Sequence, residues 1–236
     1  MKKKLFKLYL IFFLSTAFGG NSVHIIGDSH TRTFSRIPYC KIDWLGPVTL
    51  HRVGRDGLDI VDFRKLKIKD GDVVVFTFGE IDTRCHIGRQ ILDHKRKLHE
   101  VTELLAKKYI QTILANCKNY SNILPIVYLP TPPGNKQKEV PNYRFPFIGT
   151  NQQRVLWAKT LNKDLLKQCR KFKIPCINTY HIYSTPDGLL KRNLTDGHIH
   201  IHPRHAQPIK NRLDQIILNH GYKIKNDYII SGNEKE

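Results

Sequence analysis

Short apolar runs, separated by turns and by helical patterns, recur along the whole chain. The run at residues 72–78 is continuous and rich in β-branched side chains, which is typical of a strand buried on both faces of a sheet. Four other apolar runs also predict strands, at residues 23–26, 42–45, 123–129 and 174–180. The hydrophobic pattern therefore predicts a sheet of five strands.

Proline interrupts the fourth of these runs. Pro125 has no N–H to contribute to a sheet, so we expect strand pairing to begin only after it. Pro130, Pro132 and Pro133 follow the run and are expected to end the strand.

Between the strands, apolar residues recur at the spacing of one helix face. This periodicity predicts a helix over residues 90–116, a second over 155–172 and a third near the C-terminus. The third should begin after His205, because Pro208 must lie in its first turn. The apolar positions along the three faces are Leu98, Val101, Leu105 and Tyr109; Val155, Ala158, Leu161, Leu165, Cys169 and Phe172; and Ile209, Leu213, Ile216 and Ile217.

This alternation of strands and helices predicts one α/β domain over residues 23–236. Right-handed crossovers then give a three-layer α/β/α sandwich around a central, mostly parallel five-stranded sheet. Ligands of such sheets bind beyond the carboxyl ends of the strands. The turn at residues 27–30 and the segment at residues 79–86 should therefore lie at the same edge of the sheet.

Residues 1–22 predict a signal peptide or an N-terminal membrane anchor. A lysine-rich start precedes the apolar run at residues 8–14, and small residues follow it. The apolar stretch is shorter than the roughly 20 residues of a spanning helix, and a buried first helix is the alternative reading. We expect export, to the periplasm or outside the cell, or attachment to a membrane through this segment.

Charge and cysteine usage add little to this picture. The formal net charge of +19 attracts anions, but the basic residues are spread along the chain, so we expect no specific nucleic-acid site. The five cysteines include no Cys-x-x-Cys pair, which argues against structural zinc and leaves a cytoplasmic location open.

Candidate chemistry gathers at two distant segments. Ser29 follows a buried strand and the turn at Gly27 and Asp28, where backbone N–H groups can stabilise an oxyanion. A serine needs a base, and the histidine-rich segment at residues 196–203 offers one. Asp196 precedes these histidines on a loop leading into a helix, so it can orient an imidazole.

These blocks resemble the SGNH, or GDSL-type, hydrolase superfamily. Its Gly-Asp-Ser block corresponds to residues 27–29, and its closing aspartate and histidine correspond to Asp196 and His200. Its glycine block corresponds to Gly54 or Gly57, and its Gly-x-Asn-Asp block to residues 79–82. The resemblance implies a Ser29, His200 and Asp196 triad. It also implies an oxyanion and substrate-binding set, which comprises Gly54, Gly79, Glu80, Asp82 and Arg84.

The sequence departs from the family pattern at two places. Ile81 occupies the position of the family's asparagine, an oxyanion donor whose loss typically costs roughly 3–4 kcal/mol of transition-state stabilisation. Arg84 is a candidate replacement, and Glu80 is a candidate mark of a variant site. Three residues, not the family's two, separate Asp196 from His200, which leaves His198 as the fallback base.

The resemblance implies a monomeric serine ester hydrolase that removes an acetyl or fatty acyl group without a cofactor or metal. Its substrate is expected to be a small molecule, glycan or lipid ester, and the basic surface suits an anionic one.

Two other functions stay open. Residues 28–30 and 197–200 also fit the Asp-x-His and Gly-His-x-His motifs of calcineurin-like metallophosphoesterases, although no Asn-His pair lies between them. The missing asparagine also fits a catalytically degenerate SGNH-like domain that binds a glycan or a partner.

Individual residues have plainer interpretations too. Ser29 is a candidate helix cap, and Asp28 is a candidate partner for the backbone of its own turn. Asp82 and Arg84 are a candidate ion pair. Cys85 and His86 suggest a nucleophile and base, but adjacent side chains rarely face each other.

Overall fold

The computed structural model describes residues 21–140 and 142–224, so the expected leader at residues 1–22 lies almost wholly outside the described residues. Its centre is a five-stranded, fully parallel sheet in the order β2-β1-β3-β4-β5, which confirms the predicted α/β class. The strands are β1 (Val23–Gly27), β2 (Cys40–Trp44), β3 (Val73–Thr77), β4 (Leu124–Tyr128) and β5 (Cys176–Ile177).

The two central strands end level with each other. Gly27 at the end of β1 pairs in register with Thr77 at the end of β3, and both strands are buried throughout. A side chain at Gly27 would collide with Thr77, so only glycine allows this close approach. The segments that follow β1 and β3 therefore emerge together at the carboxyl edge of the sheet, as the sequence predicted.

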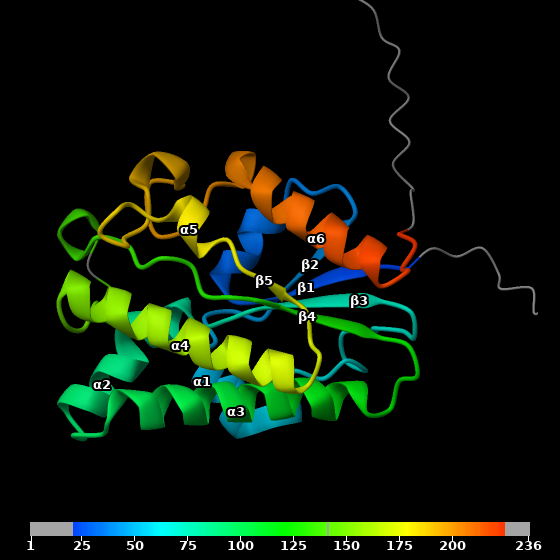
Figure 1. The fold of residues 1–236 in the computed structure, drawn as a ribbon, viewed down its shortest axis with the longest axis horizontal. Coiled ribbons are helices and arrows are strands. Elements are labelled where there is room, and N and C mark those ends of the chain that lie inside the picture. The colour runs from blue at the N-terminus through cyan, green and yellow to red at the C-terminus, as the bar shows by residue number, and fades with distance from the viewer. Residues whose placement is uncertain (1–20, 141, 225–236) are drawn as a thin grey trace, which may run out of the picture.

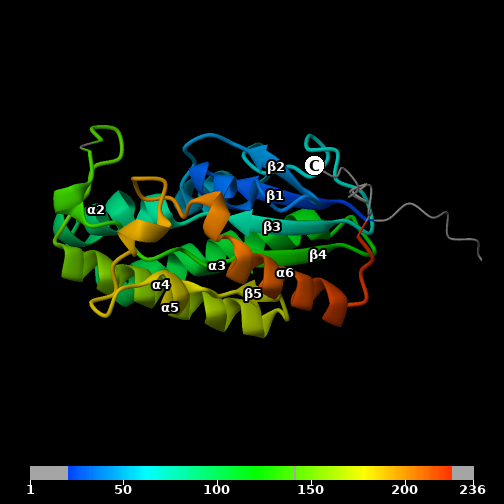
Figure 2. The same ribbon diagram turned by 90° about the horizontal axis from the view of Figure 1, so that it is seen from above.

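Helices cover both faces of the sheet (Figure 1). One layer contains α1 (Leu50–Asp56), α2 (Ile87–Leu92), α3 (Leu98–Cys117) and α4 (Asn151–Lys171). The opposite layer contains α5 (Tyr180–Tyr183) and α6 (Gln207–Asn219). In the view from above in Figure 2, α6 lies in front of the sheet. Short helical turns complete the chain: η1 (Ser29–Phe34), η2 (Gly57–Asp59), η3 (Asp82–His86), η4 (Lys136–Lys138), η5 (Arg192–Leu194) and η6 (Pro203–His205).

Alternate residues of the central strands face two separate hydrophobic cores. Val74 and Phe76 pack with α1, α3 and α4, whereas Val73 and Val75 pack with α6 on the other face. This burial on both faces explains why the strand at β3 reads as an uninterrupted apolar run. The helices within residues 21–140 and 142–224 are all too short or too polar to span a lipid bilayer.

The predicted helix over residues 90–116 is wrong in its N-terminal part. The chain forms α2 and α3 with a break between them, where Lys95 has a φ of 55°. That left-handed backbone angle cannot continue an α-helix. The helix at residues 155–172 is confirmed as α4, and α6 begins after His205 with Pro208 in its first turn.

The expectation that pairing in the fourth strand begins after Pro125 is also wrong. Pro125 pairs in register with Val74 of β3. Val127 and Leu129 donate their N–H groups to the β5 side, so the missing N–H of Pro125 faces that side too. There β5 is only two residues long and does not reach Pro125, so the proline leaves no hydrogen bond unmade.

Candidate active site

The turn after β1 fixes the position of Ser29. Asp28 is the N-cap of η1, and its side chain accepts a hydrogen bond from the backbone N–H of His30 at 2.8 Å. The interpretation of Asp28 as a partner of its own turn is therefore confirmed, and Ser29 is not the cap. Ser29 instead occupies the first helical position, where backbone N–H groups lack partners within the helix.

Ser29 meets the predicted base from the far end of the chain. The His200 Nε2 atom lies 2.8 Å from the Ser29 Oγ atom, across a separation of 171 residues. On the other side of the ring, the His200 Nδ1 atom lies 2.9 Å from the Asp196 carboxylate. A hydroxyl, an imidazole and a carboxylate thus form one chain of hydrogen bonds.

The loop around His200 explains how three intervening residues are accommodated. Thr195 and Ile201 form an antiparallel bridge, and the Asp196 N–H donates to the His200 carbonyl at 3.0 Å. Gly197 has a φ of 95°, which favours glycine and turns the chain back on itself. The Asp196 carboxylate therefore returns to the imidazole despite the longer spacing.

Electrostatics keeps the His200 imidazole neutral. Burial lowers the pKa of His200 to about 4, and the nearby His30 adds to this effect although Asp196 opposes it. The pKa of Asp196 is lowered, because the interaction with His200 and the N–H of His198 outweigh partial burial. At neutral pH the ring can accept a proton from Ser29 while the carboxylate holds its other nitrogen.

A second histidine–aspartate pair lies behind the first. The His30 ring is 4.8 Å from the His200 ring, and its Nδ1 atom is 3.1 Å from the buried Asp28 carboxylate. Burial lowers the pKa of His30, but Asp28 outweighs it and the net pKa is raised. His30 is one of the groups that lower the pKa of His200, and no motif in the sequence indicated this contact.

Ser29 and His200 line a space of about 280 Å³, which we call the cleft. Half of its lining residues are apolar, among them Ile81 and Phe147, and the other half are polar. Its lining residues are Ser29, Pro47, Ile81, Arg84, Glu139, Val140, Asn142, Phe145, Phe147, His198, Ile199 and His200.

Arg84 reaches the cleft from η3, and the structure pairs it with Glu80. The two side chains are 3.3 Å apart and almost fully buried, so the expected Asp82–Arg84 ion pair is wrong. The guanidinium groups of Arg84 and Arg154 lie 5.4 and 5.0 Å from the centre of the Phe147 ring. Arg154 and Phe147 carried no motif signal, because their arrangement arises only on folding.

Four residues of the predicted oxyanion and substrate-binding set do not line the cleft. Gly54 lies within α1, where a Cβ would come within 2.9 Å of the Lys108 Cβ, so it serves helix packing. Gly79 makes a turn with a φ of 116° against Pro130. Asp82 is fully buried and accepts the backbone N–H groups of Leu50 and His51, at 2.6 and 3.0 Å.

Asp82 therefore holds the start of α1 against η3. Burial raises its pKa to about 7, although the two backbone N–H groups favour the carboxylate. Glu80 does not line the cleft either, and its connection with the cleft is the ion pair with Arg84. Of the predicted set, Arg84 alone faces the cleft.

The remaining candidates point elsewhere. His198 is largely exposed, and its Nδ1 atom is 3.8 Å from Glu139, so His200 and not His198 contacts Ser29. The Cys85 thiol donates to the Ile81 carbonyl, and His86 stacks on His51. Within residues 21–140 and 142–224, no three His, Cys, Asp or Glu side chains converge in a way that suits a metal ion.

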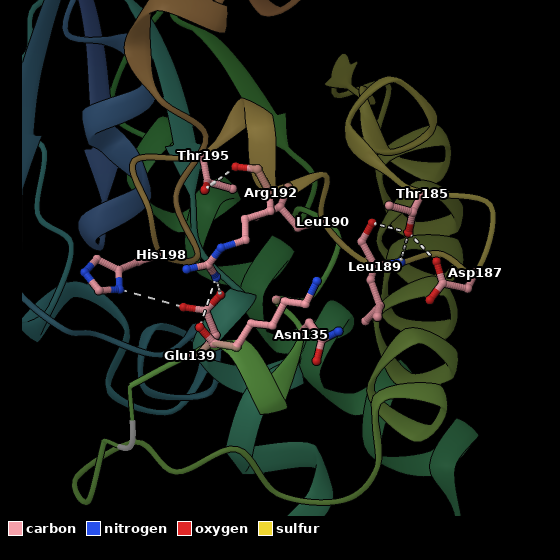
Figure 3. Close-up of a pocket in the computed structure, with 11 residues that line it drawn as sticks. Asn135, Glu139, Thr185, Asp187, Leu189, Leu190, Arg192, Thr195 and His198 are labelled. Carbon is pink, nitrogen blue, oxygen red and sulfur yellow. Dashed lines mark hydrogen bonds and ion pairs between the residues drawn. The ribbon is translucent and has the colours of Figure 1, made fainter.

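A second cavity of about 230 Å³ adjoins the cleft and shares Glu139 and His198 with it. We call it the polar cavity. Figure 3 shows Glu139 between His198 and Arg192, with the turn at Thr185 and Asp187 on the far side. Arg192 and Glu139 are 3.3 Å apart. The lining residues are Gly134, Asn135, Lys138, Glu139, Thr185, Asp187, Leu189, Leu190, Arg192, Thr195 and His198.

Comparison with known proteins gives a result for the fold alone. No family model matches the sequence, and no curated protein matches it. Among solved structures, a candidate acylhydrolase from Bacteroides fragilis superposes with a TM-score of 0.56 at 16% identity, over 84% of this chain and 87% of that chain.

Two further solved structures have similar scores. The native aryl esterase of M. smegmatis gives a TM-score of 0.51 at 12% identity, over 85% of this chain and 99% of that chain. A member of the lipolytic G-D-S-L family from Veillonella parvula gives 0.50 at 13% identity, over 84% and 99%. The chain therefore has the three-layer α/β fold of the GDSL-type, or SGNH, hydrolases.

Proposed function

We propose that this chain is a serine ester hydrolase in which Ser29 is the nucleophile. The observation that carries the proposal is the continuous path from Ser29 Oγ to His200 Nε2 at 2.8 Å, and from His200 Nδ1 to Asp196 at 2.9 Å. The likeness of the fold to acylhydrolases and esterases supports it. The same geometry fits neither a helix-capping serine nor a metal-ligating histidine.

The mechanism follows from the residues in this path. Ser29 Oγ attacks the ester carbonyl carbon while His200 Nε2 takes its proton, and Asp196 stabilises the imidazolium. The imidazolium then gives the proton to the leaving alcohol, and an acyl group stays on Ser29. A water molecule, deprotonated by His200, attacks the acyl carbon; the bond to Ser29 Oγ then breaks, the acid leaves, and His200 returns the proton to Ser29 Oγ.

The oxyanion needs donors that replace the family's asparagine. The N–H of Ser29 is at the first position of η1, where a donor is available for the developing charge. We assign the second donor to Arg84, because it lines the cleft beside Ser29 and Ile81. Glu80 and Phe147 hold its guanidinium in place.

The two cavities favour a short acyl group on a hydroxyl-rich alcohol. Apolar side chains adjoin Ser29 in the cleft, and its volume of about 280 Å³ suits a short acyl group better than a long chain. The polar cavity offers charged and amide side chains, and only Leu189 and Leu190 among its lining residues are apolar. Such a lining can hydrogen-bond several sugar hydroxyls, whereas a fatty acyl chain would leave these groups unpaired.

The direct test is hydrolysis of 4-nitrophenyl acetate by the wild type and by Ser29→Ala, each with and without a chelator. The proposal expects activity that Ser29→Ala abolishes and that chelation leaves unchanged. Chelator-sensitive phosphodiesterase activity that survives Ser29→Ala would favour the metallophosphoesterase. No activity on any ester, together with tight glycan binding, would favour the binding domain.

The alcohol preference is tested with an acetylated xylo-oligosaccharide. Asp187→Ala should lower kcat/KM for this ester more than kcat/KM for 4-nitrophenyl acetate, because only the former extends into the polar cavity. Asp93→Ala removes an exposed aspartate outside that cavity and is the matched control. Equal losses on both esters would contradict the assignment of the polar cavity.

A further inference from the structure

A third cavity lies between α1, α2 and α3 and is strongly basic; we call it the basic cavity. It encloses about 70 Å³, which is room for several water molecules and hence for one tetrahedral oxyanion. No carboxylate is among its lining residues, which are His51, Arg55, His86, Gln90, Arg96, Val101, Leu104, Leu105 and Lys108. It is separate from the cleft: η3 presents Arg84 to the cleft and His86 to the basic cavity.

Two stacked histidines form one wall of the basic cavity. The rings of His51 and His86 are 4.1 Å apart with an angle of 23° between their planes. Burial lowers the pKa of His86 to about 4, with further lowering from His51, Arg89, Arg96 and Arg55. These neighbours disfavour a second positive charge in the pair.

The pKa of His51 is lowered for similar reasons. Burial lowers its pKa, and the charges of Arg55 and Lys108 lower it further, with Asp56 as the opposing carboxylate. Asp56 is already engaged by Arg55 at 2.5 Å and Arg52 at 3.4 Å, and it does not line the cavity. Asp56 therefore offsets part of the charge of Arg55.

Arg96 and Lys108, the other two cations that line the cavity, have no carboxylate partner comparable to Asp56 in the described part of the chain. Arg96 donates to the amide oxygen of Gln90 at 3.2 Å, and Gln90 carries no charge. Among the described residues, neither Arg96 nor Lys108 forms an ion pair. Arginine and lysine donors that converge on a recessed space, with neutral imidazoles able to take up protons, match the requirements of a bound oxyanion.

We propose that the basic cavity is a binding site for a small oxyanion, such as inorganic phosphate or sulfate, or for the same group carried on a larger molecule. The anion would accept hydrogen bonds from Arg96, Lys108 and Arg55, and it would favour protonation of His51 and His86. The site is independent of the proposed esterase activity.

The test uses the folded full chain and inorganic phosphate. The ring resonances of His51 and His86 are followed by NMR during a pH titration with and without phosphate, at an ionic strength held constant with chloride. Phosphate should raise the titration midpoint of His86, with a Kd of about 1 mM or below. No phosphate-dependent shift of either histidine would overturn the proposal.

Matched variants separate a built site from general attraction to a basic protein. Arg96→Gln/Lys108→Gln removes two exposed charges that line the cavity, and it should weaken phosphate binding about tenfold or more. Lys107→Gln/Lys163→Gln removes two exposed charges that do not line it and should change the Kd less than about twofold. Equal weakening by both pairs would overturn the proposal.

A final arm identifies the source of the oxyanion. Vesicles of phosphatidylcholine with and without phosphatidylglycerol are added in place of phosphate. Binding of phosphatidylglycerol vesicles that Arg96→Gln/Lys108→Gln abolishes, and that free phosphate competes away, assigns the site to a lipid headgroup. A histidine shift with phosphate and no vesicle binding assigns it to a free anion.

Discussion

The two halves of the candidate active site differ in how closely they follow the family pattern. On the proton-transfer side, Ser29, His200 and Asp196 occupy the expected places and meet at hydrogen-bond distance. On the oxyanion side, Ile81 replaces the asparagine, and Gly54 packs inside a helix away from the cleft. The residues proposed to move a proton match the family pattern, whereas those proposed to hold the oxyanion depart from it.

This difference has a physical reason. Proton transfer requires an imidazole and a hydroxyl in direct contact, so few other residues can take over these roles. An oxyanion needs only positioned donors, which any well-held N–H or guanidinium can supply. Arg84, held by Glu80 and by the Phe147 ring, fits this second, more permissive requirement.

The largest effect is expected on the proton-transfer side. His200→Ala should lower kcat for 4-nitrophenyl acetate by about 10⁴-fold or more, because Ser29 then has no base. The near- and far-ultraviolet circular dichroism should match the wild type. A loss of less than about tenfold in a folded variant would contradict the role of His200.

The second-largest effect on kcat is expected on the oxyanion side, from the removal of Arg84. Removing Arg84 alone leaves Glu80 buried and unpaired, which destabilises folding by about 3–5 kcal/mol, so the variant is Glu80→Gln/Arg84→Gln. Its kcat should be about 10²–10³-fold below that of Glu80→Gln, with a similar KM. Adding Ile81→Asn should restore part of the loss. Equal kcat in the single and double variants would exclude Arg84 as an oxyanion donor.

The pH profile tests the electrostatics of His200. The base acts when neutral, so a pKa of about 4 predicts that kcat/KM stays level from neutral pH to about 5 and falls below about 4. An unshifted histidine would lose about tenfold by pH 5.5. His30→Gln should move the acid limb to higher pH, because the neighbouring His30 adds to the effect of burial in lowering the pKa of His200.

Loss of folding stability at low pH must be measured as a control for the pH profile of kcat/KM. The depressed pKa values of His200 and His86 each contribute stability that is lost as pH falls from about 6.5 towards 4, whereas the raised pKa of Asp82 contributes stability that is gained as pH falls below about 7. Ellipticity must therefore be recorded at each pH. A fall in kcat/KM near pH 6.5 with the fold intact would show that His200 is not shifted.

The smallest effect on activity is expected from Gly54→Ala. The new methyl group would press on Lys108 at 2.9 Å, and the free energy of unfolding should fall by about 1–2 kcal/mol. Because Gly54 does not line the cleft, kcat/KM should stay within about twofold of the wild type. A large loss of kcat in a stable variant would restore Gly54 to the oxyanion side.

Hydrophobic periodicity predicted the sheet and the three longest helices, α3, α4 and α6. The meeting of Ser29 with His200 was expected from the rule that parallel strands gather their ligands at one edge, together with the resemblance to the SGNH hydrolases. The strand limits were less predictable. Pro125 is tolerated only because β5 is too short to reach it, and no local pattern reports the length of a neighbouring strand.

The surroundings of the site were the least predictable part. Residues 82–86 form a π-helix, whose wider turn sets which side chains face the cleft, so ordinary helical spacing does not place Arg84. Phe147 and Glu139 come from loops without a motif, and their positions depend on long-range packing. Asp82 matched the family block, yet it is buried against α1 and not open to substrate.

The central claim is that Ser29 is a nucleophile activated by His200. Its most direct measurement is the intact mass and peptide map of the chain after treatment with diisopropyl fluorophosphate, in which an activated serine oxygen displaces fluoride. The account predicts one adduct, on Ser29, that is absent from Ser29→Ala and from His200→Ala. Absence of any adduct in the folded wild type, or an adduct on another residue, would contradict it.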